Sequence, residues 1–358
     1  MMNRSQVLVV GLGQCGGVLA DKMKSKNRRY TTVYINSSLG DTELLEFAND
    51  EVNTFNYAGA DGSGRDREKA RIFIENDSAR LATFFKRFSQ FKTMLVFSSL
   101  DGGTGSGSIF TFVQIIKTLY PNMKINVVGV LPKLTEQDLQ LKNTLKCCED
   151  LSKISDLIND IKFINNNKRA NAEYDEINEE AIDDIDISYG MTGHDTVGSI
   201  DENNLENVCT SQGYGVVLKL PKHYEGLKEA LTEAIKNSIF SIPPKLDCSY
   251  GAINIVKADY NIERVVGLVN ADQTIYKTYN DEYNLIALGG CSIPMYDIEC
   301  IKLELQERDK NKSTTKRNLG FKYSFESDVV EDIKPKEKKK SLNDKDIDAL
   351  LDFNKFRR

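Results

Sequence analysis

A glycine-rich run between two apolar segments limits the fold of this chain more than any other feature. The run covers residues 101–108, with the sequence DGGTGSGS, and it follows the apolar stretch Met94–Phe97. Apolar residues then recur at helical spacing from Ile109 to Ile116. Glycines let backbone N–H groups turn inward, and hydroxyl groups add donors beside a helix N-terminus that favours anions. The pattern predicts a strand, a phosphate-binding loop and a helix, with phosphate held by Gly102, Gly103, Thr104, Gly105 and Ser106.

This loop does not have the sequence of a Walker loop, which requires GxxxxGK[ST]. When Gly102 and Gly107 are placed on the two glycines of that motif, Ser108 occupies the position of the phosphate-binding lysine. The sequence therefore excludes a P-loop ATPase and indicates a phosphate-binding loop of another type.

The composition is that of a folded protein with a sizeable core. Of 358 residues, 40% are hydrophobic, which predicts about two domains followed by a tail. No apolar run reaches the ~20 residues of a membrane span, and residues 1–10 enter a strand pattern rather than a signal sequence, so we expect a cytoplasmic protein with no membrane partner. Seven cysteines without a CxxC pair, and only two histidines, predict reduced thiols and no metal site built by the protein.

The charges are distributed unevenly along the chain. Residues 310–358 contain 14 basic and 9 acidic residues, a balance of +5, which leaves a balance of −11 for residues 1–309. An acidic body does not predict direct DNA binding, whereas a basic tail can meet an acidic surface, including another copy of the same body.

Short apolar runs alternate with helical patterns over the first half of the chain. The expected strands are 6–10, 31–35, 94–97 and 124–131, and the expected helices are 18–23, 44–47, 69–88 and 139–161. This alternation predicts an α/β fold with a doubly wound parallel sheet, whose ligand lies at the carboxyl ends of the strands.

The second half predicts a smaller α+β domain, with strands at 213–220, 251–258, 265–270 and 285–290 and a helix at 227–240. The predicted organisation is a nucleotide-binding domain at 1–185, the end of a central helix and a loop at 186–212, the second domain at 213–309, and a basic tail at 310–358 that is partly disordered.

A second glycine motif, Gly11–Gly16, has the spacing GxGxxG of dinucleotide-binding proteins. A dehydrogenase would also need a carboxylate about 20 residues further on, at the end of the second strand, to bind the ribose hydroxyls. Asn36 occupies that position, and a dehydrogenase leaves the loop at Asp101 unexplained. An NAD-dependent oxidoreductase is therefore the weaker alternative.

The glycine-rich run resembles the GGTG[ST]G signature of the tubulin/FtsZ family, and five further loops resemble that family in the same order. GLGQCGG at 11–17 is similar to its first nucleotide loop, Asn36-Ser37-Ser38 to the second without its Asp, and 59–65 to the third. Pro132 and Glu136 lie like the proline and the ribose-contacting glutamate of FtsZ, and Asn166 like its guanine-reading Asn. Beyond the run at 101–108, the resemblance implies GTP/GDP binding by Gly13, Gln14, Cys15, Asn36, Gly62, Ser63, Gly64, Pro132, Glu136 and Asn166.

Guanine presents donor and acceptor groups together with an exocyclic amine. Asn36 and Asn166 are able to read the base, and one acid of the group Asp183, Asp184 and Asp186 is expected to meet the amine. The sequence leaves the choice among these three acids open. The accompanying Mg²⁺ is expected to be held mainly by phosphates and water.

The hydrolytic residues are expected in another part of the chain. Residues 201–213 align without gaps on the catalytic loop that an adjacent FtsZ subunit inserts against the γ-phosphate. Asp201 matches the first acid of that loop, Asn204 stands where the second acid would be, and Glu202 is a nearby carboxylate. The alternative is that Asp201 only caps a helix.

The resemblance implies a GTPase that self-associates into filaments. The chain departs from the family pattern in three places: the second loop lacks its Asp, Asp101 replaces a usual Gly, and Asn204 replaces an acid. With these departures the chain most resembles the TubZ group of plasmid- and phage-encoded tubulin homologues. That group implies segregation of DNA through a DNA-binding adaptor protein held by the tail. The alternatives are a divergent cell-division protein and a filament that binds GTP without hydrolysing it.

Overall fold

The computed structural model describes residues 3–314 except residues 223 and 225. Most of the predicted tail, from residue 315 onward, lies outside the described residues. The described residues up to Ser313 form one compact unit. Among the described helices, none combines the length and the apolar character needed to span a bilayer.

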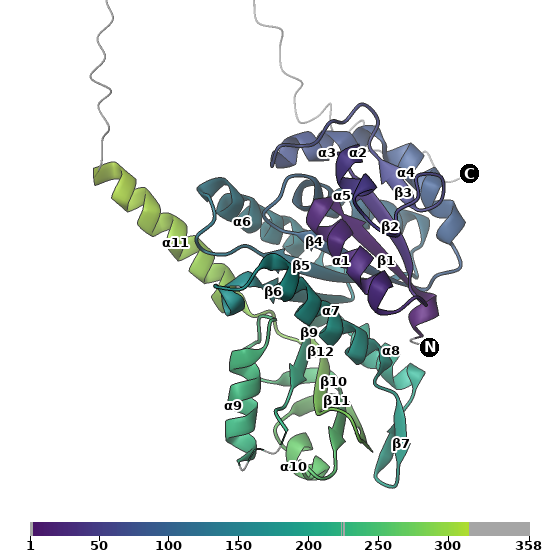
Figure 1. Cartoon of the computed structure of the whole chain (residues 1–358), viewed down its shortest axis with the longest axis vertical. Helices are drawn as coiled ribbons and strands as arrows, with labels where there is room; N and C mark the ends of the chain where they lie inside the picture. Colours follow the sequence, from purple (N-terminus) through teal and green to yellow (C-terminus); the bar gives the residue numbers. More distant parts are fainter. Residues whose placement is uncertain (1–2, 223, 225, 315–358) are drawn as a thin grey trace, which may run out of the picture. The chain divides into compact units, whose positions relative to one another are not determined.

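A single ten-stranded sheet runs through the described part of the chain in the order β11-β10-β12-β9-β6-β5-β4-β1-β2-β3 (Figure 1). Neighbouring strands from β3 to β9 are parallel, and β12 is antiparallel to both of its neighbours. The strands are β1 (Val7–Leu12), β2 (Thr31–Asn36), β3 (Thr54–Asn56), β4 (Thr93–Ser99), β5 (Lys124–Leu131), β6 (Asp160–Asn165), β9 (Gly213–Lys219), β10 (Asp247–Val256), β11 (Asn270–Asn280) and β12 (Leu285–Cys291). The predicted doubly wound, mostly parallel sheet is confirmed.

Helices cover both faces of this sheet, so its central strands β1, β4, β5 and β6 are buried on both sides. In β1, Leu8 and Val10 join one core cluster and Val7 and Val9 join the other. Helices α1, α7 and α8 pack on one face, and α3 to α6 and α9 to α11 pack on the other. The helices are α1 (Gly13–Lys26), α2 (Leu39–Glu43), α3 (Arg67–Asn76), α4 (Ser78–Phe85), α5 (Thr104–Leu119), α6 (Asp138–Lys153), α7 (Tyr174–Gly190), α8 (Glu202–Cys209), α9 (Leu227–Asn237), α10 (Ile262–Val266) and α11 (Met295–Thr314).

Several predicted elements differ from those in the structure. The helix predicted at 139–161 ends at Lys153, and the strand β6 begins at Asp160. The sequence analysis did not predict β6 because the strand contains two charged residues. Asp160 and Lys162 are both buried in it and form an ion pair with each other. The strand predicted at 265–270 was also wrong, since α10 ends at Val266 and β11 begins at Asn270.

Two short strands, β7 (Gly193–Asp195) and β8 (Gly198–Ile200), form a hairpin within residues 186–212, where the sequence predicted the end of a central helix and a loop. The hairpin connects α7 to α8, so the chain leaves the long helix and enters the candidate catalytic loop through a defined element (Figure 1).

Candidate functional site

A cavity of about 680 Å³ opens at the carboxyl ends of β1, β2, β4, β5 and β6. These ends lie at one edge of the sheet because the five strands are parallel. Fourteen of the residues predicted from sequence line this cavity: Gly13, Gln14, Cys15, Asn36, Gly62, Ser63, Gly64, Gly102, Gly103, Thr104, Gly105, Pro132, Glu136 and Asn166. The structure therefore brings six predicted loops to one place.

Glycine is required in this loop system because the loops approach one another closely. A Cβ atom on Gly103 would lie 2.2 Å from Ser63 Oγ and 2.8 Å from the Cα of Arg65. A Cβ atom on Gly105 would lie 2.7 Å from the carbonyl oxygen of Leu12. Gly13 itself has a φ of 71°, a conformation that other residues rarely adopt. The glycine-rich run at 101–108 is the fourth loop, after the first, second and third loops named above. Any larger side chain at these positions would push the first, third and fourth loops apart.

Three hydroxyl groups meet in the middle of the loops. Thr104 Oγ1 lies 2.6 Å from Ser37 Oγ and 3.1 Å from Ser63 Oγ. All three side chains are buried, and each comes from a different loop. One threonine therefore fixes the relative positions of the second, third and fourth loops.

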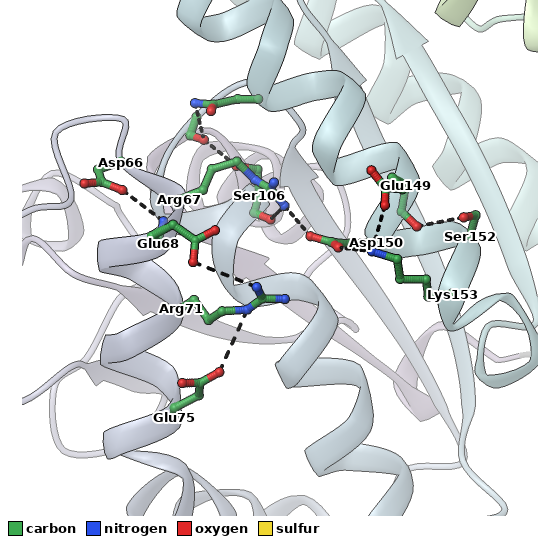
Figure 2. Close-up of polar contacts among 12 residues, drawn as sticks. Asp66, Arg67, Glu68, Arg71, Glu75, Ser106, Glu149, Asp150, Ser152 and Lys153 are labelled. Atoms are coloured by element: carbon green, nitrogen blue, oxygen red, sulfur yellow. Dashed lines mark hydrogen bonds and ion pairs between the residues drawn. The ribbon is translucent and has the colours of Figure 1, made fainter. Parts of the chain in front are cut away.

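Ser106 is buried beneath the fourth loop and does not line the cavity, in contrast to its predicted contact with phosphate. Its hydroxyl donates to the carbonyl of Gly102, and Arg67 Nη2 donates to its carbonyl oxygen at 2.9 Å. The same nitrogen lies 2.7 Å from Asp150 Oδ2 (Figure 2). Burial raises the pKa of Asp150, but its hydrogen bond and charge interaction with Arg67 outweigh this effect and lower the pKa below the ordinary value. Ser106 therefore supports the loop from inside.

One buried amide in the cavity has an unused acceptor. Asn166 lines the cavity and is 5% exposed, yet its Oδ1 has no hydrogen-bond partner among the described residues. Leaving a buried amide oxygen without a partner costs about 1–3 kcal/mol. Asn36, the other predicted base-reading amide, already accepts from the N–H of Ser37 at 2.8 Å and donates to Asp41.

The first turns of α7 supply cavity residues that the sequence analysis did not identify. Tyr174, Asp175 and Asn178 all line the cavity, with Asp175 and Asn178 three positions apart on one helix face. The Tyr174 hydroxyl donates to the predicted ribose contact Glu136. The three-residue spacing of Asp175 and Asn178 was the only sequence signal for these cavity residues. That spacing is informative only when the first residue of α7 is known.

Asp183, Asp184 and Asp186 were the candidates for binding the exocyclic amine of guanine. In the structure, each of them contacts a side chain from another element, and none of them lines the cavity. Asp183 Oδ1 lies 2.6 Å from the Nζ atom of Lys26, and Asp184 pairs with Lys219. Asp186 accepts from Arg4 at 2.6 Å and from Tyr30 at 2.8 Å. They lie about two to three turns beyond Asp175 along α7, past the residues that line the cavity, and the carboxylate that α7 contributes to it is Asp175.

The candidate catalytic residues lie at the opposite edge of the sheet. Asn3 precedes β1 at its amino-terminal end, and its Nδ2 donates to Glu202 Oε1 at 3.1 Å. Asp201 is exposed and caps α8: its Oδ1 accepts from the N–H of Asn204 at 2.8 Å, and Asn204 Oδ1 accepts from the N–H of Asp201 at 3.0 Å. This reciprocal capping box makes the loop rigid. Asp201, Glu202 and Asn204 do not line the cavity of their own subunit.

A doubly wound sheet with glycine loops at its carboxyl edge defines a nucleotide-binding α/β protein. Residues 6–171 match the model described as Tubulin/FtsZ family, GTPase domain. These residues therefore belong to the tubulin/FtsZ family and form its GTPase domain, which confirms the resemblance predicted from the loops.

The curated relatives include the tubulin-like protein TubZ of Clostridium botulinum C phage, which is 24% identical over 98% of this chain and 93% of its own length. The tubulin-like protein CetZ of Methanothrix thermoacetophila is 31% identical over 41% of this chain and 44% of its own. Among solved structures, TubZ of Clostridium botulinum phage c-st superposes with a TM-score of 0.78 at 24% identity, over 87% of this chain and all of the other. A GTPγS-form protofilament of Bacillus thuringiensis serovar israelensis TubZ gives a TM-score of 0.70 at 14% identity, covering 86% and 93%.

Proposed function

We propose that this chain binds GTP in the cavity and hydrolyses it as part of a filament. The observation that carries the proposal is the meeting of five glycine- and amide-bearing loops at one cavity whose volume suits a nucleotide. The unpaired Oδ1 of Asn166 supports a base with a donor group at this position. Asn178 and Asp175 supply a further amide and a carboxylate for the guanine edge, in place of Asp183.

The charges of the cavity support a divalent cation with the nucleotide. The lining contains four carboxylates, from Asp41, Asp101, Glu136 and Asp175, and one basic side chain, that of Arg65. A triphosphate would therefore enter an environment that repels it unless a cation accompanies it. Mg²⁺ neutralises phosphate charge and takes oxygen ligands, which this lining provides.

We place the hydrolytic step at the contact between two subunits. The cavity lies at the carboxyl edge of the parallel strands, and Asp201 lies near Asn3 at the amino edge. When subunits stack in one direction, Asp201 of one copy faces the cavity of the next. Its carboxylate would accept a proton from the attacking water, while the Asn204 amide orients the water without accepting a proton.

The filament itself is supported by solved relatives that are described as TubZ protofilaments and as a two-stranded TubZ filament. We propose that the filament moves plasmid or phage DNA, with the basic tail holding a DNA-binding adaptor. The similarity to a phage-encoded TubZ supports this role over cell division.

The nucleotide carried by the purified protein tests the first part of the proposal. We expect guanine nucleotide to elute from denatured protein, and phosphate release per subunit to rise with protein concentration as filaments form. Elution of NAD would favour the oxidoreductase instead. Turnover per subunit that does not change with protein concentration would contradict a site shared between subunits.

The tail residues beyond 314 lie outside the described residues, so the tail is tested by deletion. A protein ending at Ser327 should keep GTPase activity and assembly but lose the adaptor, because the removed segment carries the lysine cluster at 336–340 and the amphipathic end at 347–353. Co-sedimentation with adaptor–DNA complex measures this, and equal recovery by both proteins would contradict the tail as the link to DNA.

A further inference from the structure

We propose that Asp101 is a direct protein ligand of the divalent cation that accompanies the bound nucleotide. This inference rests on the proposed GTP binding. It adds a protein ligand to the sequence-based expectation that the cation is held mainly by phosphates and water, and it gives a role to a carboxylate placed where the family usually has glycine.

Asp101 lies at the start of the phosphate loop and lines the same cavity as Gly102, Gly103 and Thr104. The negative charge of Asp101 also affects Cys15. The pKa of the Cys15 thiol is raised to about 12, mainly by burial and in addition by the Asp101 carboxylate. Cys15 belongs to the first loop, which faces the fourth loop in this site. The carboxylate therefore acts on the interior of the site and not only on the surrounding solvent.

One oxygen of this carboxylate is held in place and the other is available. Gln140 Nε2 donates to Asp101 Oδ2 at 2.9 Å, and the Gln140 side chain is only 4% exposed. No described residue forms a hydrogen bond with Oδ1 of Asp101. Asn143, one turn further along α6, donates to the backbone carbonyl of Asp101 at 3.1 Å. Two amides thus fix the residue and leave one carboxylate oxygen for a ligand.

Among the residues that the structure describes, no basic side chain forms an ion pair with Asp101. The cavity's only basic side chain among the described residues, Arg65, donates to Gln140 Oε1 at 2.9 Å and not to the carboxylate. Gln140 is neutral, so the Asp101 charge persists beside the loop that should hold phosphate. Without a cation, this carboxylate would repel a triphosphate. With Mg²⁺ between them the interaction becomes attractive, and Mg²⁺ is commonly bound by one or two carboxylates together with phosphate oxygens.

The test measures GTP affinity in saturating Mg²⁺ and in excess EDTA for the full chain and for Asp101→Asn. Asparagine keeps an acceptor for Gln140 Nε2 but removes the charge. We expect the gain in GTP affinity on adding Mg²⁺ to be at least about tenfold smaller in the variant than in the wild type, since changing even the residues that support metal ligands costs about 10- to 100-fold in metal affinity. In EDTA the variant should bind GTP more tightly than the wild type, because the repulsion is gone.

Glu43→Gln is the matched control, since Glu43 is exposed at the end of α2, does not line the cavity and loses the same charge. It should keep the wild-type response to Mg²⁺. Asp101→Gly provides a second variant, with the residue usual in the family, and should reproduce Asp101→Asn. Electron paramagnetic resonance of Mn²⁺ with GTP in ¹⁷O water should count one more bound water in either Asp101 variant than in the wild type.

Two failures are distinguishable. Wild-type protein that binds GTP, with an equal Mg²⁺ response and an equal water count in Asp101→Asn, would overturn the ligand role and leave the proposed function standing. Wild-type protein that binds no GTP with or without Mg²⁺ would overturn both.

Discussion

Thr104 joins three loops of the candidate site, because its Oγ1 contacts the hydroxyls of Ser37 and Ser63. We expect Thr104→Ala to keep the fold and to lower GTP turnover about 30-fold, because two lost hydrogen bonds of about 1 kcal/mol each would act on the barrier. Thr104→Ser retains the hydroxyl and should stay close to wild type. Phosphate release measures both, and wild-type turnover in Thr104→Ala would remove Thr104 from the site.

Residues whose backbone geometry is special could be predicted from sequence, whereas residues on a helix face could not. Gly13, Gly103 and Gly105 are fixed by close approaches that only glycine permits, so their pattern in the sequence is itself the signal. Asp175 and Asn178 carry no such pattern. Their place depends on how the short helix at Asn166–Arg169 sets the start of α7, which is a property of the packed structure.

At the scale of elements, Arg67 connects α3, α5 and α6 behind the phosphate loop (Figure 2). The pair of Arg67 and Asp150 is mostly buried, with side chains 8% and 14% exposed. We expect Arg67→Leu to lower the free energy of unfolding by about 3 kcal/mol, because it removes the buried partner of Asp150 and leaves this carboxylate only the half-exposed Lys153 at 3.3 Å. Urea denaturation measures the change.

Arg71 provides the matched control one turn along α3. It lies 3.9 Å from Glu68 and 3.8 Å from Glu75, and both acids are well exposed. Arg71→Leu should change the free energy of unfolding by less than about 1 kcal/mol, since exposed pairs contribute little. Equal losses in the two variants would mean that the Arg67 pair has no special structural role.

The same pair predicts a pH effect. The pKa of Asp150 is lowered in the folded protein, so its contribution to stability is present above its unfolded pKa of about 3.9 and is lost as the pH falls through the folded pKa. The stability of the wild type should therefore fall more steeply below pH ~4 than that of Asp150→Asn. Parallel denaturation curves at a series of acidic pH values make the comparison, and identical slopes would contradict it.

The prediction of secondary structure from sequence was wrong where polar residues lie in the core. β6 carries Asp160 and Lys162, which are buried as a pair, so its alternation of polar and apolar residues did not stand out from the preceding helix. The strands β1, β4 and β5 are buried on both faces and apolar almost throughout, so they could be located. The position of β6 depends on contacts in the packed structure, whereas the positions of β1, β4 and β5 follow from their local composition.

At the scale of the whole molecule, α7 separates the two halves of the proposed reaction site. Its first turns line the cavity, and its 17 residues extend about 25 Å toward the hairpin and α8. A loop at that distance is unable to act on its own cavity. The sequence predicted two separate groups of residues, and the structure shows that these groups lie at opposite edges of one sheet.

Asp201 both caps α8 and is the proposed proton acceptor, and Asp201→Asn separates these two roles. Asparagine is as good an N-cap as aspartate, so α8 should remain intact while the carboxylate is lost. We expect normal GTP binding and assembly, phosphate release lowered about 100-fold or more, and filaments that persist. Light scattering and phosphate release measure this, and wild-type release by the variant would reduce Asp201 to a cap.

Mixing two impaired variants tests whether adjacent subunits share the site. Thr104→Ala has a damaged cavity and an intact Asp201 loop, and Asp201→Asn has an intact cavity and a damaged loop. In a mixed filament, some contacts join the intact cavity of one variant to the intact loop of the other. We therefore expect the mixture to release phosphate faster than either variant alone at the same total concentration. Copolymers with no gain in phosphate release would contradict a site completed by the next subunit.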